Sequence, residues 1–111
     1  MAGNNGLLEV TDDNFASEVE AGEGLRVIDF WAEWCGPCRI IGPIVADLAS
    51  DYSDKGVKVG KLDVDANQRT ASRFNVLSIP TIIFFKNGEE VGRHVGLAPK
   101  KNLAKKIESF L

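Results

Sequence analysis

Residues Leu25–Cys38 read LRVIDFWAEWCGPC, and they give the strongest indication of the fold class. Its first eight residues are almost continuously apolar and include β-branched and aromatic side chains, which is typical of a strand covered on both faces. A helical pattern runs from Cys35 to about Tyr52, because apolar residues recur there at spacings of three and four. The two cysteines of the chain, Cys35 and Cys38, therefore lie where a buried strand passes into a helix.

Strand and helix patterns alternate on both sides of this junction. On the N-terminal side we expect a strand at 7–10 and a helix at 12–21, with Thr11 as its N-cap and acidic residues in its first turn. On the C-terminal side the patterns predict strands at 57–63, 81–86 and 89–95, and helices at 66–74 and from Pro99 onward. Asn87-Gly88 predicts a tight hairpin between the last two strands. The order predicts an α/β fold with a mixed central β-sheet of about five strands, flanked by about four helices.

Length, composition and charge exclude several classes of protein. The 111 residues, 44% hydrophobic and 26% charged, predict one globular domain over 7–111 after a flexible tail at 1–6. A net charge of −3 argues against a nucleic-acid-binding protein. No apolar stretch approaches the roughly 20 residues of a membrane-spanning helix, and the first residues do not resemble a secretory signal. We therefore expect a monomer in the cytoplasm, with no membrane or nucleic-acid partner.

The two cysteines form a local Cys-x-x-Cys pair at a helix start. With one histidine in the chain, they cannot supply four ligands of a structural zinc site, so no metal is expected. Residues i and i+3 lie on one helical face, so the pair can form and break a disulfide with little backbone movement. Unpaired amides and the helix dipole stabilise a thiolate at the outermost position, which predicts Cys35 as nucleophile and Cys38 as resolving thiol. Gly36 permits the tight turn, and Pro37 presets the helix entry.

Two other interpretations of the pair are an inert structural disulfide and two buried core thiols. A loop of four residues gains little stability from a cross-link, so the structural disulfide is the weaker explanation. The strand before the motif and the helix after it favour the redox interpretation.

The chain resembles the thioredoxin family from about residue 7 to residue 111. The resemblance rests on WCGPC preceded by VIDFWAE, and on the downstream segments KLDVD, SIPT and FFKNG, which stand in the family's order. It implies the thioredoxin fold and a protein-disulfide reductase without a bound cofactor, whose only redox group is the Cys35–Cys38 disulfide. It also implies protein disulfides as substrates, and a thioredoxin reductase or an equivalent electron donor as partner.

Asp29 interrupts the apolar strand before the motif. An edge carboxylate facing water is the ordinary interpretation, but the flanking residues are too apolar for that position. Burial would raise the pKa of the carboxyl group, and perturbed groups near a nucleophile are candidate acids or bases. The resemblance implies that Asp29 accepts the proton of Cys38. It also pairs Lys61 with Asp29 as a tuning charge, although a plain surface lysine fits Lys61 equally well.

The resemblance further implies a substrate-binding surface around the cysteines. It places a cis Pro80 against the pair, and the amide and carbonyl of Ile79 would bind an extended substrate as an added strand. Trp34 belongs to the docking surface, whereas Trp31 is interpreted as core. The remaining members of this surface are Gly36, Pro37, Val64, Val95, Gly96 and Leu97. Leu77-Ser78 departs from the commonest family pattern, which bears on partner preference and not on chemistry.

Three functions fit these residues. The first is a dithiol reductase that acts through a mixed disulfide. The second is an oxidant or isomerase on the same fold, although Gly-Pro between the cysteines matches the reducing members of the family. The third is a binding subunit that uses the apolar rim without catalysis.

Overall fold

A single five-stranded sheet organises the molecule in the computed structural model, which describes residues 6–111. The strands are β1 (Leu8–Glu9), β2 (Leu25–Trp31), β3 (Lys58–Asp63), β4 (Thr81–Lys86) and β5 (Glu89–Val95). Their order is β1-β3-β2-β4-β5, with β1, β3 and β2 parallel and β4 and β5 antiparallel to their neighbours. The predicted mixed sheet is confirmed. The expected tail at 1–6 lies outside the described residues except for Gly6, which is exposed.

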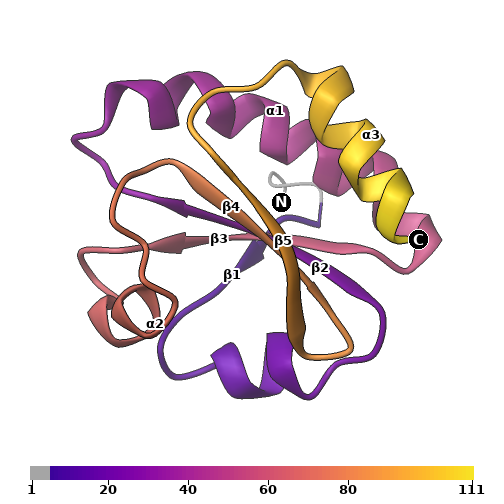
Figure 1. Ribbon diagram of the computed structural model, residues 1–111, viewed down its shortest axis with the longest axis horizontal. Coiled ribbons are helices and arrows are strands. Elements are labelled where there is room, and N and C mark those ends of the chain that lie inside the picture. The colour runs from indigo at the N-terminus through magenta and orange to yellow at the C-terminus, as the bar shows by residue number, and fades with distance from the viewer. Residues whose placement is uncertain (1–5) are drawn as a thin grey trace.

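Helices cover both faces of this sheet (Figure 1). On one face lie α1 (Gly36–Tyr52) and α3 (Lys100–Phe110), and on the other lie η1 (Ala16–Glu20) and α2 (Gln68–Arg73). A short 3₁₀ turn, η2 (Ser53–Lys55), follows α1. The α/β class, with four helices about a mixed sheet, is therefore as predicted. Within residues 6–111, every helix is too short or too polar to cross a membrane.

The alternation of side chains along β2 creates two apolar cores. Val27 packs with α1 and α3, whereas Ile28 and Phe30 pack with η1 and α2. Asp29 shares the face of Val27, since residues two apart point to the same side of a strand. The fold therefore places this carboxylate beneath α1, the helix that carries the cysteines.

The Asn87-Gly88 turn forms the predicted hairpin between β4 and β5. Both residues have positive φ angles, 52° for Asn87 and 88° for Gly88, as a two-residue hairpin turn requires. A Cβ atom at Gly88 would also collide with the carbonyl group of Glu20. Glycine is therefore required there both by the turn and by the packing against η1.

The N-terminal helix differs from the prediction. In place of an α-helix over 12–21, the chain forms the short π-helix η1, in which the Ala21 amide bonds the Ala16 carbonyl at 2.8 Å. The carboxylate of Asp12 does not serve this helix. It accepts hydrogen bonds from the Thr70 amide at 2.8 Å and the Thr70 hydroxyl at 2.6 Å, at the start of α2. The expectation that Asp12 serves the first turn of the N-terminal helix was wrong, because a carboxylate near the start of one helix can cap a second helix that is adjacent only in space.

We expect Asp12→Ala to lower the free energy of unfolding by about 1 kcal/mol, because it removes a cap of α2. Burial by itself would raise the pKa of Asp12, but hydrogen bonds from Thr70 and Arg69 outweigh it and lower the pKa below 3.8. The stabilisation is therefore complete above about pH 4 and is lost as the pH falls through the folded-state pKa. Urea unfolding at neutral and acid pH measures the difference. Asp13→Ala is the control, since that side chain is 98% exposed and should cost little.

Candidate active site

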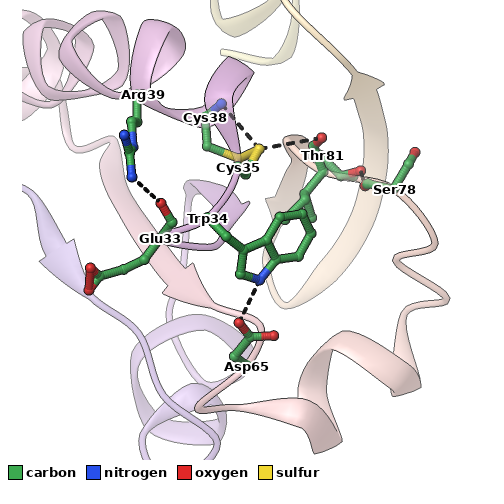
Figure 2. The surroundings of a disulfide bond; sticks show 9 residues. Glu33, Trp34, Cys35, Cys38, Arg39, Asp65, Ser78 and Thr81 are labelled. Atoms are coloured by element: carbon green, nitrogen blue, oxygen red, sulfur yellow. Dashed lines mark hydrogen bonds between the residues drawn. A yellow bond between two sulfur atoms is a disulfide. The ribbon is translucent and has the colours of Figure 1, made fainter.

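The cysteine pair lies at the N-terminus of α1. Cys35 is the N-cap with an extended backbone, and Cys38 lies in the first turn, with a Cα–Cα distance of 5.3 Å and a disulfide between them. The Cys38 amide donates a hydrogen bond to Cys35 Sγ at 3.2 Å (Figure 2). Pro37, at the start of the helix, has no amide that would need a partner. An amide and the helix dipole thus converge on the outer sulfur, which favours a thiolate there.

The two sulfurs face different neighbours, although both cysteines are only 4% exposed. Cys35 Sγ lies 3.7 Å from the carbonyl oxygen of Ile79. Ile79 belongs to an open groove of about 360 Å³ that also includes Trp34, Val64, Val76, Leu77 and Ser78. Cys38 lines a separate cleft beneath α1, which we call the Asp29 cleft. It is their surroundings, and not their exposure, that distinguish the two cysteines.

A tightly held turn precedes β4 beside the disulfide. The Ile79–Pro80 peptide bond is cis. The Thr81 hydroxyl donates to the Ser78 carbonyl at 2.6 Å, and the Gly96 amide donates to the Pro80 carbonyl at 2.8 Å. Gly96 has a φ angle of 93°, which favours glycine. These bonds hold the Ile79 carbonyl next to Cys35 and join the turn to the loop after β5.

The Asp29 cleft has a volume of about 350 Å³. Asp29 is 3% exposed, and burial raises the pKa of its carboxyl group to about 7 against the opposing charge of Lys61. Lys61 is the register partner of Asp29 on β3, and its ammonium group lies 5.0 Å from the ring centroid of Trp31. The structure therefore brings Asp29, Lys61 and Cys38 together around one cleft. A carboxyl group that titrates near neutrality can exchange a proton with a neighbouring thiol.

The rim residues that the resemblance implies are exposed to different degrees. Trp34 is 68% exposed, and its indole N–H donates to the Asp65 carboxylate at 2.8 Å (Figure 2). Val95 and Leu97 are also exposed, whereas Val64 is partly buried against the cysteine pair. Exposed apolar side chains gathered around a reactive group are typical of a surface that binds partners.

Comparison with known proteins identifies the family. A family model described as Thioredoxin matches residues 6–109. The chain belongs to the thioredoxin family. The thioredoxin of Staphylococcus saprophyticus is 50% identical over 105 residues, covering 95% of this chain and 98% of that protein. The thioredoxins of Staphylococcus haemolyticus and Staphylococcus aureus are each 48% identical, with the same coverage.

Membership of the thioredoxin family defines the chemistry of the cysteine pair. The pair is a redox-active disulfide, and the protein is a thiol-disulfide oxidoreductase. Within residues 6–111, no three His, Cys, Asp or Glu side chains gather in a way that could hold a metal ion.

Asp65 and Arg39 at this site escaped sequence reasoning, and Leu77 entered it only through partner preference. Asp65 holds the indole of Trp34 by accepting its N–H. Its position just after β3 could have indicated this contact, because the C-terminal ends of the parallel strands β2 and β3 meet at one edge of the sheet. Leu77 is 93% exposed in the groove, which an apolar residue in a loop before a proline could have indicated. Arg39 lines the Asp29 cleft and donates to the Glu33 carbonyl at 2.9 Å. That contact depends on how the loop before the helix folds back, and no pattern in the sequence reports it.

Proposed function

We propose that this protein reduces protein disulfides, with Cys35 as the attacking thiolate and Cys38 as the resolving thiol. The observation that carries the proposal is the asymmetry of the pair. Cys35 caps α1, accepts an amide hydrogen bond and lies beside Ile79 of the open groove, whereas Cys38 lines the same cleft as the buried carboxyl group of Asp29. This asymmetry supports Cys35 as the nucleophile toward substrate and Asp29 as the proton acceptor for Cys38.

The proposed reaction proceeds in two exchanges. The Cys35 thiolate attacks one sulfur of the substrate disulfide, forming a mixed disulfide and releasing the other substrate sulfur as a thiolate. Asp29, in its ionised form, then takes the proton of the Cys38 thiol. The Cys38 thiolate attacks Cys35 Sγ, which breaks the mixed disulfide, releases the second substrate thiolate and leaves the Cys35–Cys38 disulfide. Lys61 favours the ionised form of Asp29, because its positive charge lowers the pKa that burial raises.

The substrate is proposed to bind as an extended segment beside Ile79. The Ile79 amide and carbonyl would pair with the segment as an added strand. Trp34, Gly36 and Pro37 would contact the segment at one side, and the rim residues Val64, Val95, Gly96 and Leu97 at the other. All of these residues are exposed or only partly buried, so a bound segment could reach them, which supports this assignment.

The remaining proposals concern the protein's setting. Residues 7–111 act as one domain and as a monomer in the cytoplasm, without a bound cofactor. The partners are protein disulfides and a thioredoxin reductase or an equivalent electron donor, and neither nucleic acid nor membrane is bound. The family membership and the net charge of −3 support these proposals.

Reduction of insulin disulfides, with dithiothreitol as the electron source, tests the proposed function. The wild-type protein should accelerate precipitation of the freed insulin chain, and Cys35→Ser should not.

A redox titration then separates a reductase from an oxidant. A reductase pair should stay oxidised in a buffer of mostly reduced glutathione and require dithiothreitol, whereas an oxidant pair would be reduced by glutathione. A binding subunit would show no acceleration at all.

Tryptophan emission should rise when the protein is reduced. Trp31 packs against the cysteine pair and Trp34 directly precedes it, and a disulfide in contact with an indole ring quenches its fluorescence. Emission spectra before and after dithiothreitol measure the effect, with Trp31→Phe and Trp34→Phe separating the two rings. A spectrum that dithiothreitol leaves unchanged would contradict the packing of Trp31 on the sulfurs.

A further inference from the structure

His94 closes the turn at the end of β5 with its side chain. Its ring atom Nε2 lies 3.1 Å from the carbonyl oxygen of Leu97, three residues further along the chain. A carbonyl oxygen can only accept a hydrogen bond, so the ring donates its Nε2–H in this contact. We call residues 94–97 the His94 turn. It contains two apolar residues of the rim, Val95 and Leu97, which are 54% and 49% exposed.

Hydrogen bonds connect the His94 turn to the reactive disulfide. The Gly96 amide, in the middle of the turn, donates to the Pro80 carbonyl at 2.8 Å. Pro80 follows Ile79, whose carbonyl oxygen lies 3.7 Å from Cys35 Sγ. A shift of the turn would therefore move its two apolar side chains relative to the nucleophile.

Packing contributes little to the position of this turn. Val95 and Leu97 are about half exposed, and a Cβ atom at Gly96 would meet no atom within 4 Å. Gly96 has a φ angle of 93°, and glycine loses more conformational freedom on ordering than any other residue. Ala98, at 8% exposure, is the next buried residue along the chain. Hydrogen bonds therefore hold the backbone between Val95 and Ala98, and the His94 ring supplies one of them.

We propose that His94 is a positioning residue for substrate binding, whose ring fixes the His94 turn so that Val95 and Leu97 face the substrate segment in one arrangement. The inference rests on the proposed function, which assigns these two residues to the substrate surface. A turn that is already ordered does not have to be ordered when the substrate binds, so the hydrogen bond favours affinity. The ring acts through the Leu97 carbonyl, so the rate of disulfide exchange itself should not depend on it.

Two substitutions separate the hydrogen bond from the bulk of the ring. His94→Leu keeps an apolar side chain and removes the donor, whereas His94→Gln supplies an amide N–H that can reach the Leu97 carbonyl. Insulin reduction by dithiothreitol, measured at increasing insulin concentration, separates KM from kcat. His94→Leu should raise KM about fivefold, the effect of one net hydrogen bond, and leave kcat unchanged. His94→Gln should restore the wild-type KM.

Two controls show whether the effect is specific to the rim. Val91→Ala truncates an apolar side chain that is 43% exposed on the same strand, near the Asn87-Gly88 turn, and should leave KM and kcat unchanged. Hydroxyethyl disulfide is too small to span the rim, so the pre-reduced protein should reduce it equally fast with either His94 variant.

Amide hydrogen exchange measures the turn in the absence of substrate. The Gly96 amide should exchange faster in His94→Leu than in the wild type and should return to the wild-type rate in His94→Gln. Amides in the middle of β4 should be unaffected. An unchanged Gly96 rate in His94→Leu would overturn the proposal, and so would a fall in kcat or a slower reaction with hydroxyethyl disulfide.

Leu97→Ala distinguishes failure of this inference from failure of the proposed substrate surface. If Leu97→Ala raises the KM for insulin and His94→Leu does not, the surface stands and the role of His94 is wrong. If neither variant raises KM although Gly96 exchange accelerates in His94→Leu, the rim is not part of the substrate surface, and the inference fails with it.

Discussion

Cys38→Ser is expected to leave the protein covalently attached to its substrates, whereas Cys35→Ser is expected to trap none. Cys35 receives the amide hydrogen bond and the helix dipole, and its sulfur adjoins the groove. Without Cys38, attack on a substrate disulfide still proceeds, but the mixed disulfide is not resolved. In the wild type, Cys38 lies one helical turn away, at a high effective concentration, and releases the substrate.

Non-reducing gels of cell extract measure this trapping. Adducts should appear with Cys38→Ser and disappear after dithiothreitol, and insulin reduction should be abolished in both variants. The double variant is the control for non-covalent binding through the rim. If Cys35→Ser captured as many partners as Cys38→Ser, the assignment of nucleophile and resolving thiol would be wrong.

Asp29→Asn should lower the turnover of insulin reduction about 100-fold at neutral pH and much less at high pH. The wild-type rate should rise as the pH passes the Asp29 pKa of about 7, because only the ionised carboxylate can accept the Cys38 proton. The variant lacks this rise, and at high pH hydroxide replaces the missing base. Rates measured from pH 6 to pH 9 test this. An equal loss at every pH would contradict a role in proton transfer.

The same substitution should stabilise the protein at high pH. The pKa of Asp29 is about 7 when folded, against an ordinary value of 3.8, so between these values the folded state holds the proton more tightly. Stability therefore falls as the pH rises through this window, by about 4 kcal/mol at about 1.4 kcal/mol per pKa unit. Asp29→Asn removes this penalty. Urea unfolding should show the variant more stable by several kcal/mol near pH 8 and no more stable than the wild type near pH 4.

The reduced activity and the increased stability together separate a catalytic effect from misfolding. A variant that lost activity because it unfolded would also lose stability at every pH. Asp29→Asn is expected to do the opposite at neutral pH, since a buried charge that costs stability is retained where chemistry uses it.

Much of the fold could be predicted because its signals are local. The apolar run of β2, the helical spacing of α1 and the Asn87-Gly88 turn each depend on neighbours within a few residues, and the structure confirms all three. The π-helix η1 was not predicted, because burial of Phe15 and Val19 satisfies an α-helical pattern equally well. The capping of α2 by Asp12 was missed because it joins residues 58 positions apart.

The order of strand and helix patterns predicted the fold class, and the Cys-x-x-Cys pair at a helix start, together with the resemblance to the thioredoxin family, predicted a redox-active disulfide. The surroundings of each sulfur could be seen only in the folded protein. It placed the Ile79 carbonyl beside Cys35 and the Asp29 cleft beside Cys38, and it gave Trp34 its bond to Asp65. The burial and the charges around a side chain arise from segments that are far apart in the sequence. The apolar residues around Asp29 predicted its burial, but its pKa also depends on α1, which covers it, and on Lys61 of the neighbouring strand β3.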